Sequence, residues 1–308
     1  MNLKFKENIL SPLLVLAIIV IVTAVNFIPA EAIGIKDNPY LAVVVIQLLS
    51  YAIPALFYSR IRGKELTPKL KLRFFKPSQI LFLIMATVFL ICGTVLISMA
   101  MYKFAPNAFE ASAVSEYAAF AMNRRLFDGV YLIVAFAVLP AITEEFVFRG
   151  IILGEYQHRG VVLASMISSA MFAMAHFSIV RFPIYFFSGL VLALVVFATR
   201  SVLAGMVIHA LNNTFVLFAE KFITNAVDKQ NVSLTLLVII LGALALLSLL
   251  IMCFEAHTIY RRYSDANVES DHALMNKKGK FEQIAETFFS PTFLILLIVY
   301  IIVCLIEP

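Results

Sequence analysis

The sequence predicts an all-α protein, a polytopic bundle of eight or nine transmembrane helices. Hydrophobic residues make up 62% of its 308 residues and charged residues only 14%, whereas soluble domains have about half and about a quarter. The mean hydropathy of +0.96 points the same way. Apolar runs recur along the whole chain, and a membrane helix needs about 20 mostly apolar residues. We therefore expect a multi-pass protein of the cell membrane.

Nine apolar segments are expected to cross the bilayer. In order they are residues 9–29, 39–58, 78–102, 129–153, 161–178, 182–198, 202–219, 232–254 and 291–306. The sixth and the ninth are short, so one of them can fail to cross, which gives the lower count. The first segment is long for a signal peptide and is expected to be a retained helix.

Three regions are expected along the chain. Residues 1–77 hold two helices and a basic loop, and residues 221–308 hold the last helices with a charged loop. Residues 78–220 lie between them, and very short connections join four successive helices there. Short connections hold antiparallel neighbours together, so we expect this middle region to form one compact unit.

The distribution of Lys and Arg predicts a cytoplasmic N-terminus. The loop 59–77 alone holds seven of them, and such residues gather on the cytoplasmic side. Residues 255–290 are expected to form a charged cytoplasmic loop with helical pieces, and residues 103–128 an amphipathic helix on the outer face. The net charge of +5 fits these loops, with membrane lipids as partners and no nucleic acid.

Three charges interrupt the apolar run 129–153: Glu144, Glu145 and Arg149. Each costs about 3 kcal/mol near the centre of a membrane helix. Glu145 and Arg149 are four residues apart with the Glu first, the favourable order for an ion pair. Glu144 lies about 100° around the helix and has no counter-ion of its own. Pro140 removes a helix hydrogen bond and can kink the helix nearby.

Two later segments add further polar groups. Gly160 is midway between Glu144 and His176, so a symmetric hairpin places these two side chains at the same depth. His209 and Asn213 share a face of the next helix but one. Taken singly, each group has a structural explanation, such as an ion pair or a histidine bonded to a backbone carbonyl. Together they can activate water and stabilise an oxyanion, or bind a divalent metal.

These residues resemble the type II CAAX prenyl protease family, also called the Abi or CPBP family of intramembrane proteases. Its signature is EExxxR, then FxxxH, then HxxxN on successive membrane helices. The chain reads Glu144-Glu145-Phe-Val-Phe-Arg149, then Phe172-Ala-Met-Ala-His176, then His209-Ala-Leu-Asn-Asn213. The resemblance covers about residues 78–220 and implies that this region is the catalytic helix bundle.

The resemblance implies peptide-bond hydrolysis within the membrane. It assigns water activation to Glu144 and His176, the oxyanion to His209 and Asn213, and substrate-binding or structural roles to Glu145 and Arg149. The family is classed as metalloproteases, although a metal-free mechanism is also argued for it. A zinc ion here would take Glu144, His176 and His209 as ligands.

The residues themselves favour a site without an obligatory metal. A ligating histidine needs an acceptor for its other ring nitrogen, and the candidate near His209 is Asn213, whose amide better suits an oxyanion donor. The resemblance implies that the substrate is a membrane-anchored or amphipathic peptide or protein, cleaved in peptide maturation or in bacteriocin self-immunity. A non-catalytic scaffold of the same fold and a proton-coupled transporter are the alternatives.

Overall fold

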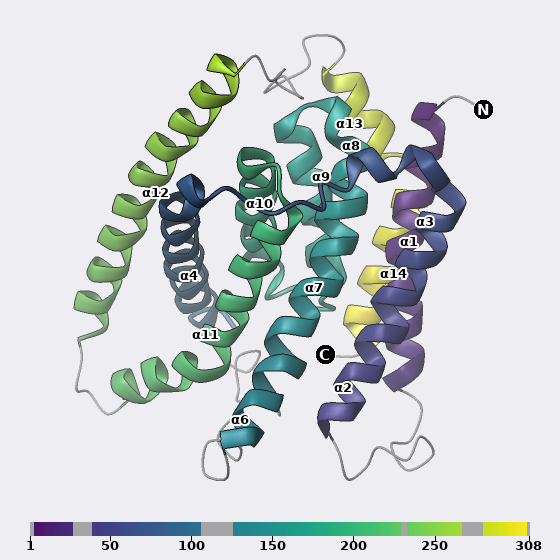
Figure 1. Cartoon of the computed structure of the whole chain (residues 1–308). Helices are drawn as coiled ribbons and strands as arrows, with labels where there is room; N and C mark the ends of the chain where they lie inside the picture. The colour runs from purple at the N-terminus through teal and green to yellow at the C-terminus, as the bar shows by residue number, and fades with distance from the viewer. Residues whose placement is uncertain (1–2, 27–38, 106–125, 229–232, 267–279, 307–308) are drawn as a thin grey trace.

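The computed structural model is a bundle of helices, and it describes residues 3–26, 39–105, 126–228, 233–266 and 280–306 (Figure 1). This arrangement confirms the all-α fold class. In chain order the α-helices are α1 (Leu3–Asn26), α2 (Pro39–Gln47), α3 (Ile53–Arg62), α4 (Ile80–Tyr102), α6 (Leu126–Ile133), α7 (Leu139–Glu145), α8 (Leu153–Tyr156), α9 (Val161–Met174), α10 (Phe182–Thr199), α11 (Val202–Asp228), α12 (Leu234–Asp265), α13 (Lys280–Phe288) and α14 (Pro291–Ile306).

The helices from α7 to α11 form the middle of the bundle. Helix α10 packs along α9, and α11 packs against both α7 and α10. Helices α4 and α12 flank this group on one side, while α1, α3 and α14 lie together on the other (Figure 1). Polar side chains on α7, α9 and α11 are therefore surrounded by other helices rather than by lipid.

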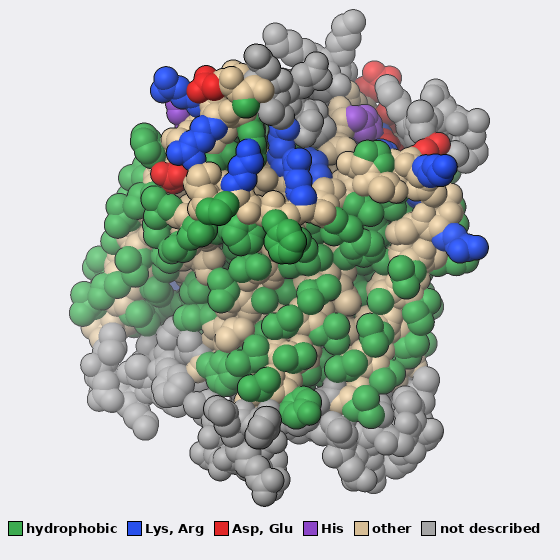
Figure 2. All heavy atoms as spheres, in the orientation of Figure 1, with side chains coloured by type: hydrophobic (Ala, Val, Ile, Leu, Met, Phe, Trp, Pro, Cys, Tyr) green, Lys and Arg blue, Asp and Glu red, His purple; other side chains and the backbone are tan. Residues whose placement is uncertain are grey.

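The surface of the bundle suits a membrane. Figure 2 shows a belt of hydrophobic side chains, with Lys and Arg gathered at one end of the molecule. Among the described residues, six helices are long and apolar enough to cross, and the bent pair Glu282–Phe288 and Pro291–Ile306 can supply a seventh. Val161–Met174 and Val202–Phe218 are shorter apolar helices. A total of eight or nine requires these two to cross as well.

Some helices end elsewhere than expected. The segment expected at 161–178 stops at Met174, and Phe177 takes a positive φ of 54° that no helix continues through. In contrast, α12 runs to Asp265, past the expected end at residue 254. The expected helix ends were placed where the apolar residues stop. Arg, Tyr and Glu can nevertheless continue a helix into water.

The third and fourth apolar segments differ in regularity, because the fourth contains widened turns. Residues 126–156 are helical throughout, with π-helical turns at Val134–Val138 and Phe146–Ile152. The first of these directly precedes α7, in which Pro140 is near the N-terminus. A π turn relieves the clash of the proline ring with the preceding turn. The second contains Arg149 and follows Glu145 without a break.

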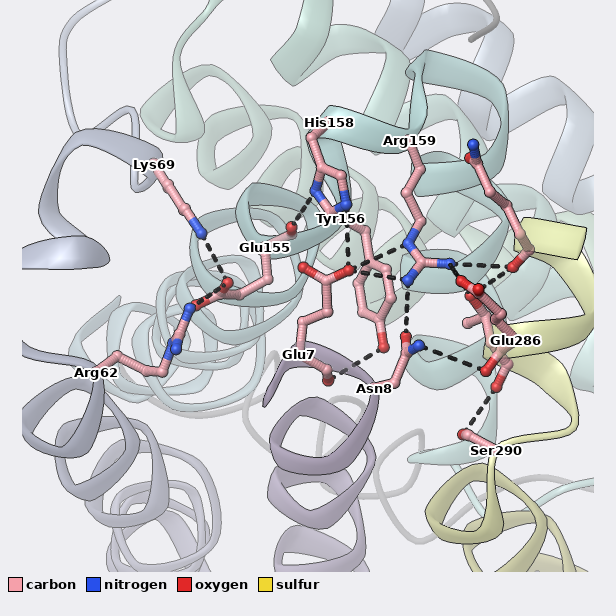
Figure 3. Close-up of polar contacts among 12 residues, drawn as sticks. Glu7, Asn8, Arg62, Lys69, Glu155, Tyr156, His158, Arg159, Glu286 and Ser290 are labelled. Carbon is pink, nitrogen blue, oxygen red and sulfur yellow. Dashed lines mark hydrogen bonds and ion pairs between the residues drawn. The ribbon is translucent and has the colours of Figure 1, made fainter. Parts of the chain in front are cut away.

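A buried polar network joins the outer helices to the middle group at the charged end (Figure 3). Arg159 donates to the Glu7 carboxylate of α1 at 2.9 Å and to Thr287 Oγ1 of α13 at 2.6 Å. Glu155 of α8 accepts from Arg62 at 2.7 Å and from Lys69 at 2.8 Å. These contacts fix α1, α3 and α13 to the turn between α8 and α9.

Two sequence-based expectations fall partly outside the described residues. Most of the amphipathic segment expected at 103–128 lies there, as do residues 267–279 of the charged stretch 255–290. Within the latter stretch, α13 is one of the expected helical pieces.

Candidate active site

The expected polar residues come from three parts of the middle group. Glu144 and Glu145 end α7, Arg149 lies in the π turn that follows, and His176 lies two residues beyond the end of α9. His209 and Asn213 are on α11. Because α11 packs on α7, and because α9 follows α8 through one tight turn, these elements converge.

Glu145 and Arg149 form the expected ion pair. Arg149 Nη1 donates to Glu145 Oε1 at 2.7 Å, and both side chains are fully buried. Arg149 Nη2 also donates to the Gly189 carbonyl of α10 at 3.3 Å, and its guanidinium lies 4.3 Å from the centre of the Phe172 ring. A buried guanidinium needs such partners, so the pair and its neighbours tie α7, α9 and α10 together.

His209 is held by the same carboxylate. Its Nδ1 lies 2.9 Å from Glu145 Oε1, which already accepts from Arg149. Since an ionised carboxylate only accepts, Nδ1 must carry the proton. The expectation that Asn213 would be the neighbour of this ring nitrogen is therefore wrong. His209 also lies within 4 Å of Glu144, so both adjacent glutamates border one site.

His176 is oriented by two neighbours from different helices. Its Nδ1 lies 2.8 Å from the Phe172 carbonyl, so Nδ1 donates and Nε2 is free to accept. Its ring stacks on Tyr185 of α10, with the ring centroids 3.9 Å apart. The end of α9 at Met174 is what allows this position, because His176 sits in the turn rather than on the helix.

Glu144 is the point at which the two imidazoles meet. Its Oε2 lies 3.8 Å from His176 Nε2 and 3.9 Å from His209 Nε2. Both distances are too long for direct hydrogen bonds but allow a water to contact the groups on either side. Glu144 and His176 lie close together, which is consistent with the hairpin expected around Gly160. A buried carboxyl group facing two imidazoles can take up and return a proton.

The donor types at this point also occur in zinc sites, but their spacing does not match one. Zinc ligands lie about 2.0–2.2 Å from the ion, which puts tetrahedral ligands roughly 3.3 Å apart. The separations from Glu144 are about half an ångström longer, and no group of three or more His, Cys, Asp and Glu side chains in the described part of the chain is placed to hold a metal ion.

Asn213 lies one turn beyond His209 and points toward the helix that carries the glutamates. Its Nδ2 is 3.5 Å from the Ala137 carbonyl, at the limit of a hydrogen bond. The neighbouring Asn212 is buried, and its Oδ1 has no hydrogen-bond partner. The structure thus places Asn213 beside a network that the other five expected site residues form: Glu144, Glu145, Arg149, His176 and His209.

Two glycines make this network possible. A Cβ on Gly205 would lie 2.8 Å from Glu145 Oε2, and one on Gly189 would lie 2.8 Å from Ser169 Cβ. Gly205 is one turn before His209 on the same helix face. In the sequence, this spacing is the signal that could have indicated room for a side chain bound to His209. Tyr185 gives no such signal, since nothing in its sequence surroundings separates it from other aromatic residues.

Known proteins resemble the part of the chain that holds this site. Residues 126–215 match the sequence profile described as type II CAAX prenyl endopeptidase Rce1-like. The membrane-embedded CAAX protease MroQ of Staphylococcus aureus (strain USA300) is 29% identical over 100 residues, which are 30% of this chain and 40% of that protein. The match therefore spans less than half the length of that relative. No solved structure matches the chain.

Proposed function

The segment 126–215 matches the Rce1-like family of type II CAAX prenyl endopeptidases, and from that premise we propose that the chain is an intramembrane endopeptidase. Its substrate is a membrane-anchored or amphipathic peptide or protein. The observation that carries the proposal is the convergence of His176 Nε2 and His209 Nε2 on one oxygen of Glu144. Packing does not require titratable groups from three segments of the chain to meet at one point, and groups arranged in this way can activate water.

Glu144 is the general base in this proposal. One water between its Oε2 and His176 Nε2 can contact both atoms across their 3.8 Å separation. The water oxygen attacks the carbonyl carbon of the scissile bond while its proton passes to Glu144. The tetrahedral intermediate then collapses, the C–N bond breaks, and the same proton passes to the leaving nitrogen.

His209 and Asn213 stabilise the oxyanion. Glu145 accepts the proton of His209 Nδ1 and so directs the other ring nitrogen, Nε2, toward the site. As an imidazolium, this ring donates from Nε2 to the oxyanion. The Asn213 amide, one turn away, supplies a second donor. Glu145 and Arg149 act through His209 and through the packing around it.

Two uses of the cleavage are consistent with the resemblance: removal of the last residues of a prenylated CAAX sequence, and maturation or inactivation of a membrane-active peptide. Both substrates lie at the membrane surface and offer a short extended segment to a buried site. The cytoplasmic N-terminus proposed from the charge distribution places the charged end of the bundle where a CAAX sequence is made.

The test is cleavage by the detergent-purified full chain. Probes are an internally quenched S-farnesyl CAAX peptide and, in parallel, the peptides released from membranes that contain the parent or Glu144→Gln. We expect Glu144→Gln to lower the rate at least about 100-fold, the usual contribution of a general base. Glu282→Gln, an exposed carboxylate on α13, is the control and should match the parent. Equal activity of Glu144→Gln and parent, or no peptide released by either, would reject the proposal.

A further inference from the structure

A glutamine on α2 reaches the candidate active site from outside the segment that matches the protease family. Gln47 is the last residue of α2, and Thr143 Oγ1 lies 3.1 Å from its Oε1. The Gln47 side chain is also a hydrogen-bonding neighbour of the Glu144 carboxylate. It therefore contacts two consecutive residues of α7, one of which is the proposed general base.

The chemistry of the amide fixes how Gln47 is used. An amide has one acceptor end and one donor end, and an ionised carboxylate can only accept. With Oε1 toward the Thr143 hydroxyl, the Nε2 group is the end that is directed to Glu144. The opposite orientation would set the amide oxygen against the carboxylate. Thr143 Oγ1 also lies 3.0 Å from the Leu139 carbonyl, so its single hydroxyl proton is shared between that carbonyl and Gln47 Oε1.

The sequence around Gln47 makes a purely structural role costly. In the apolar run 39–58, Gln47 and Ser50 are, apart from tyrosines, the polar side chains. A polar side chain inside a membrane costs free energy unless it finds a partner. Gln47 is half-buried and turned toward α7 rather than toward the headgroup region. A polar side chain inside an apolar run is also the pattern by which Glu144 was identified.

A second residue of the same segment confirms that this face of the N-terminal helices borders the site. Tyr51, one turn beyond Gln47, is buried and packs edge-on against Phe148, with ring centroids 6.4 Å apart. The turn between Gln47 and Ile53 is π-helical, a distortion that occurs often at functional sites.

We propose that Gln47 is a positioning residue for Glu144, held by Thr143, so that the N-terminal helices complete the active site. This inference rests on the proposed function of Glu144. The amide donor holds the carboxylate in the orientation in which it takes a proton from water. A hydrogen bond to a charged group changes an equilibrium about 10- to 100-fold, so its loss should lower kcat by that factor.

The experiment compares Gln47→Met, Thr143→Val and the double variant with the parent. Methionine keeps the length of glutamine and valine keeps the shape of threonine, but neither offers the hydrogen bond. For the S-farnesyl CAAX peptide we expect kcat of Gln47→Met to fall about 10- to 100-fold with KM within about twofold. Because the two side chains act as one unit, the double variant should lose no more than Gln47→Met alone. Thr143→Ser should retain the parent rate.

A second readout needs no substrate. Dicyclohexylcarbodiimide attacks protonated carboxyl groups in apolar surroundings, and modification of Glu144 is read by mass spectrometry of its peptide. Without the amide donor the Glu144 carboxyl group loses a neighbour that holds it in place, so Gln47→Met should be labelled about threefold faster or more. Leu48→Met, an exposed neighbour on the same segment, is the control and should match the parent in both assays.

The outcomes separate the two proposals. Parent-like kcat and parent-like labelling of Gln47→Met would overturn the role of Gln47 while leaving the protease intact. A fall in kcat together with a lower Tm and a changed KM would show a structural residue instead. If the parent cleaves no probe, the protease proposal fails, and faster labelling of Glu144 in Gln47→Met would still establish that Gln47 controls this carboxyl group.

Discussion

Glu145 Oε1 lies 2.9 Å from His209 Nδ1, so one member of the glutamate pair orients an imidazole whose other nitrogen faces the second member. Glu145 also pairs with Arg149 and is fully buried, whereas Glu144 has no guanidinium of its own. This arrangement gives two adjacent carboxylates different tasks. One fixes the geometry of the site, and the other is left with an oxygen directed at both imidazoles.

Replacement of Glu145 should first of all lower the free energy of unfolding of the protein. Glu145→Ala leaves the Arg149 guanidinium buried without its counter-charge, and breaking such a pair costs about 3–5 kcal/mol. Adding Arg149→Met should recover part of that loss, because no uncompensated charge remains. Unfolding in detergent by a denaturing surfactant measures both variants. Equal stability of Glu145→Ala and parent would show that the pair is not structural.

Gly205 should not tolerate a side chain. The Cβ of Gly205→Ala would lie 2.8 Å from Glu145 Oε2 and 3.1 Å from Val196 Cγ2, so the carboxylate must move away from His209. We expect a loss of about 1–3 kcal/mol in stability, as for other overpacked sites, with lower proteolysis.

The matched control for this variant is Gly242→Ala on α12, where a Cβ meets nothing within 4 Å. Alanine favours a helix over glycine by about 1 kcal/mol, so this variant should be as stable as the parent or slightly more so. Similar losses in the two glycine variants would contradict the close approach of α11 to Glu145.

Metal content should distinguish the two mechanisms discussed for the family. We expect the purified, active protein to contain less than one zinc per chain and to keep its activity after chelation, because the Glu144 and imidazole separations exceed those of bound ligands. Stoichiometric zinc, with activity lost on chelation and restored by zinc, would show that these side chains close on a metal. The carboxylate behind His209 would then orient a ligand.

The orientation in the membrane can be tested with two exposed phenylalanines on either side of α4. In a variant without the native cysteines, Phe74→Cys should react with an impermeant thiol reagent only from the cytoplasmic side, and Phe104→Cys only from the outside. Both positions are at least 80% exposed, so labelling should be efficient. The reverse pattern would invert the proposed topology.

Much of the fold could be predicted from the sequence, because the constraint that lipid places on a helix acts on each segment separately. A helix in lipid must be apolar over its length and must satisfy its own backbone, so composition alone marks each segment. The ends of α9 and α12 did not follow, because they depend on backbone turns and on polar residues that continue a helix into water. The π turns near Pro140 and Arg149 likewise depend on packing between helices, which no local sequence pattern predicts.

The sequence by itself singled out the residues that we propose for the chemistry: Glu144, Glu145, Arg149, His176, His209 and Asn213 stand out because charged and polar side chains are expensive in an apolar helix. Tertiary structure alone decided their partners. That His209 is bound by Glu145 rather than by Asn213, and that Gln47 of a distant helix reaches Thr143, depends on how α2, α7 and α11 cross. Hydrogen bonds are short and directional, so a contact between helices is set by their packing and not by the spacing along either one.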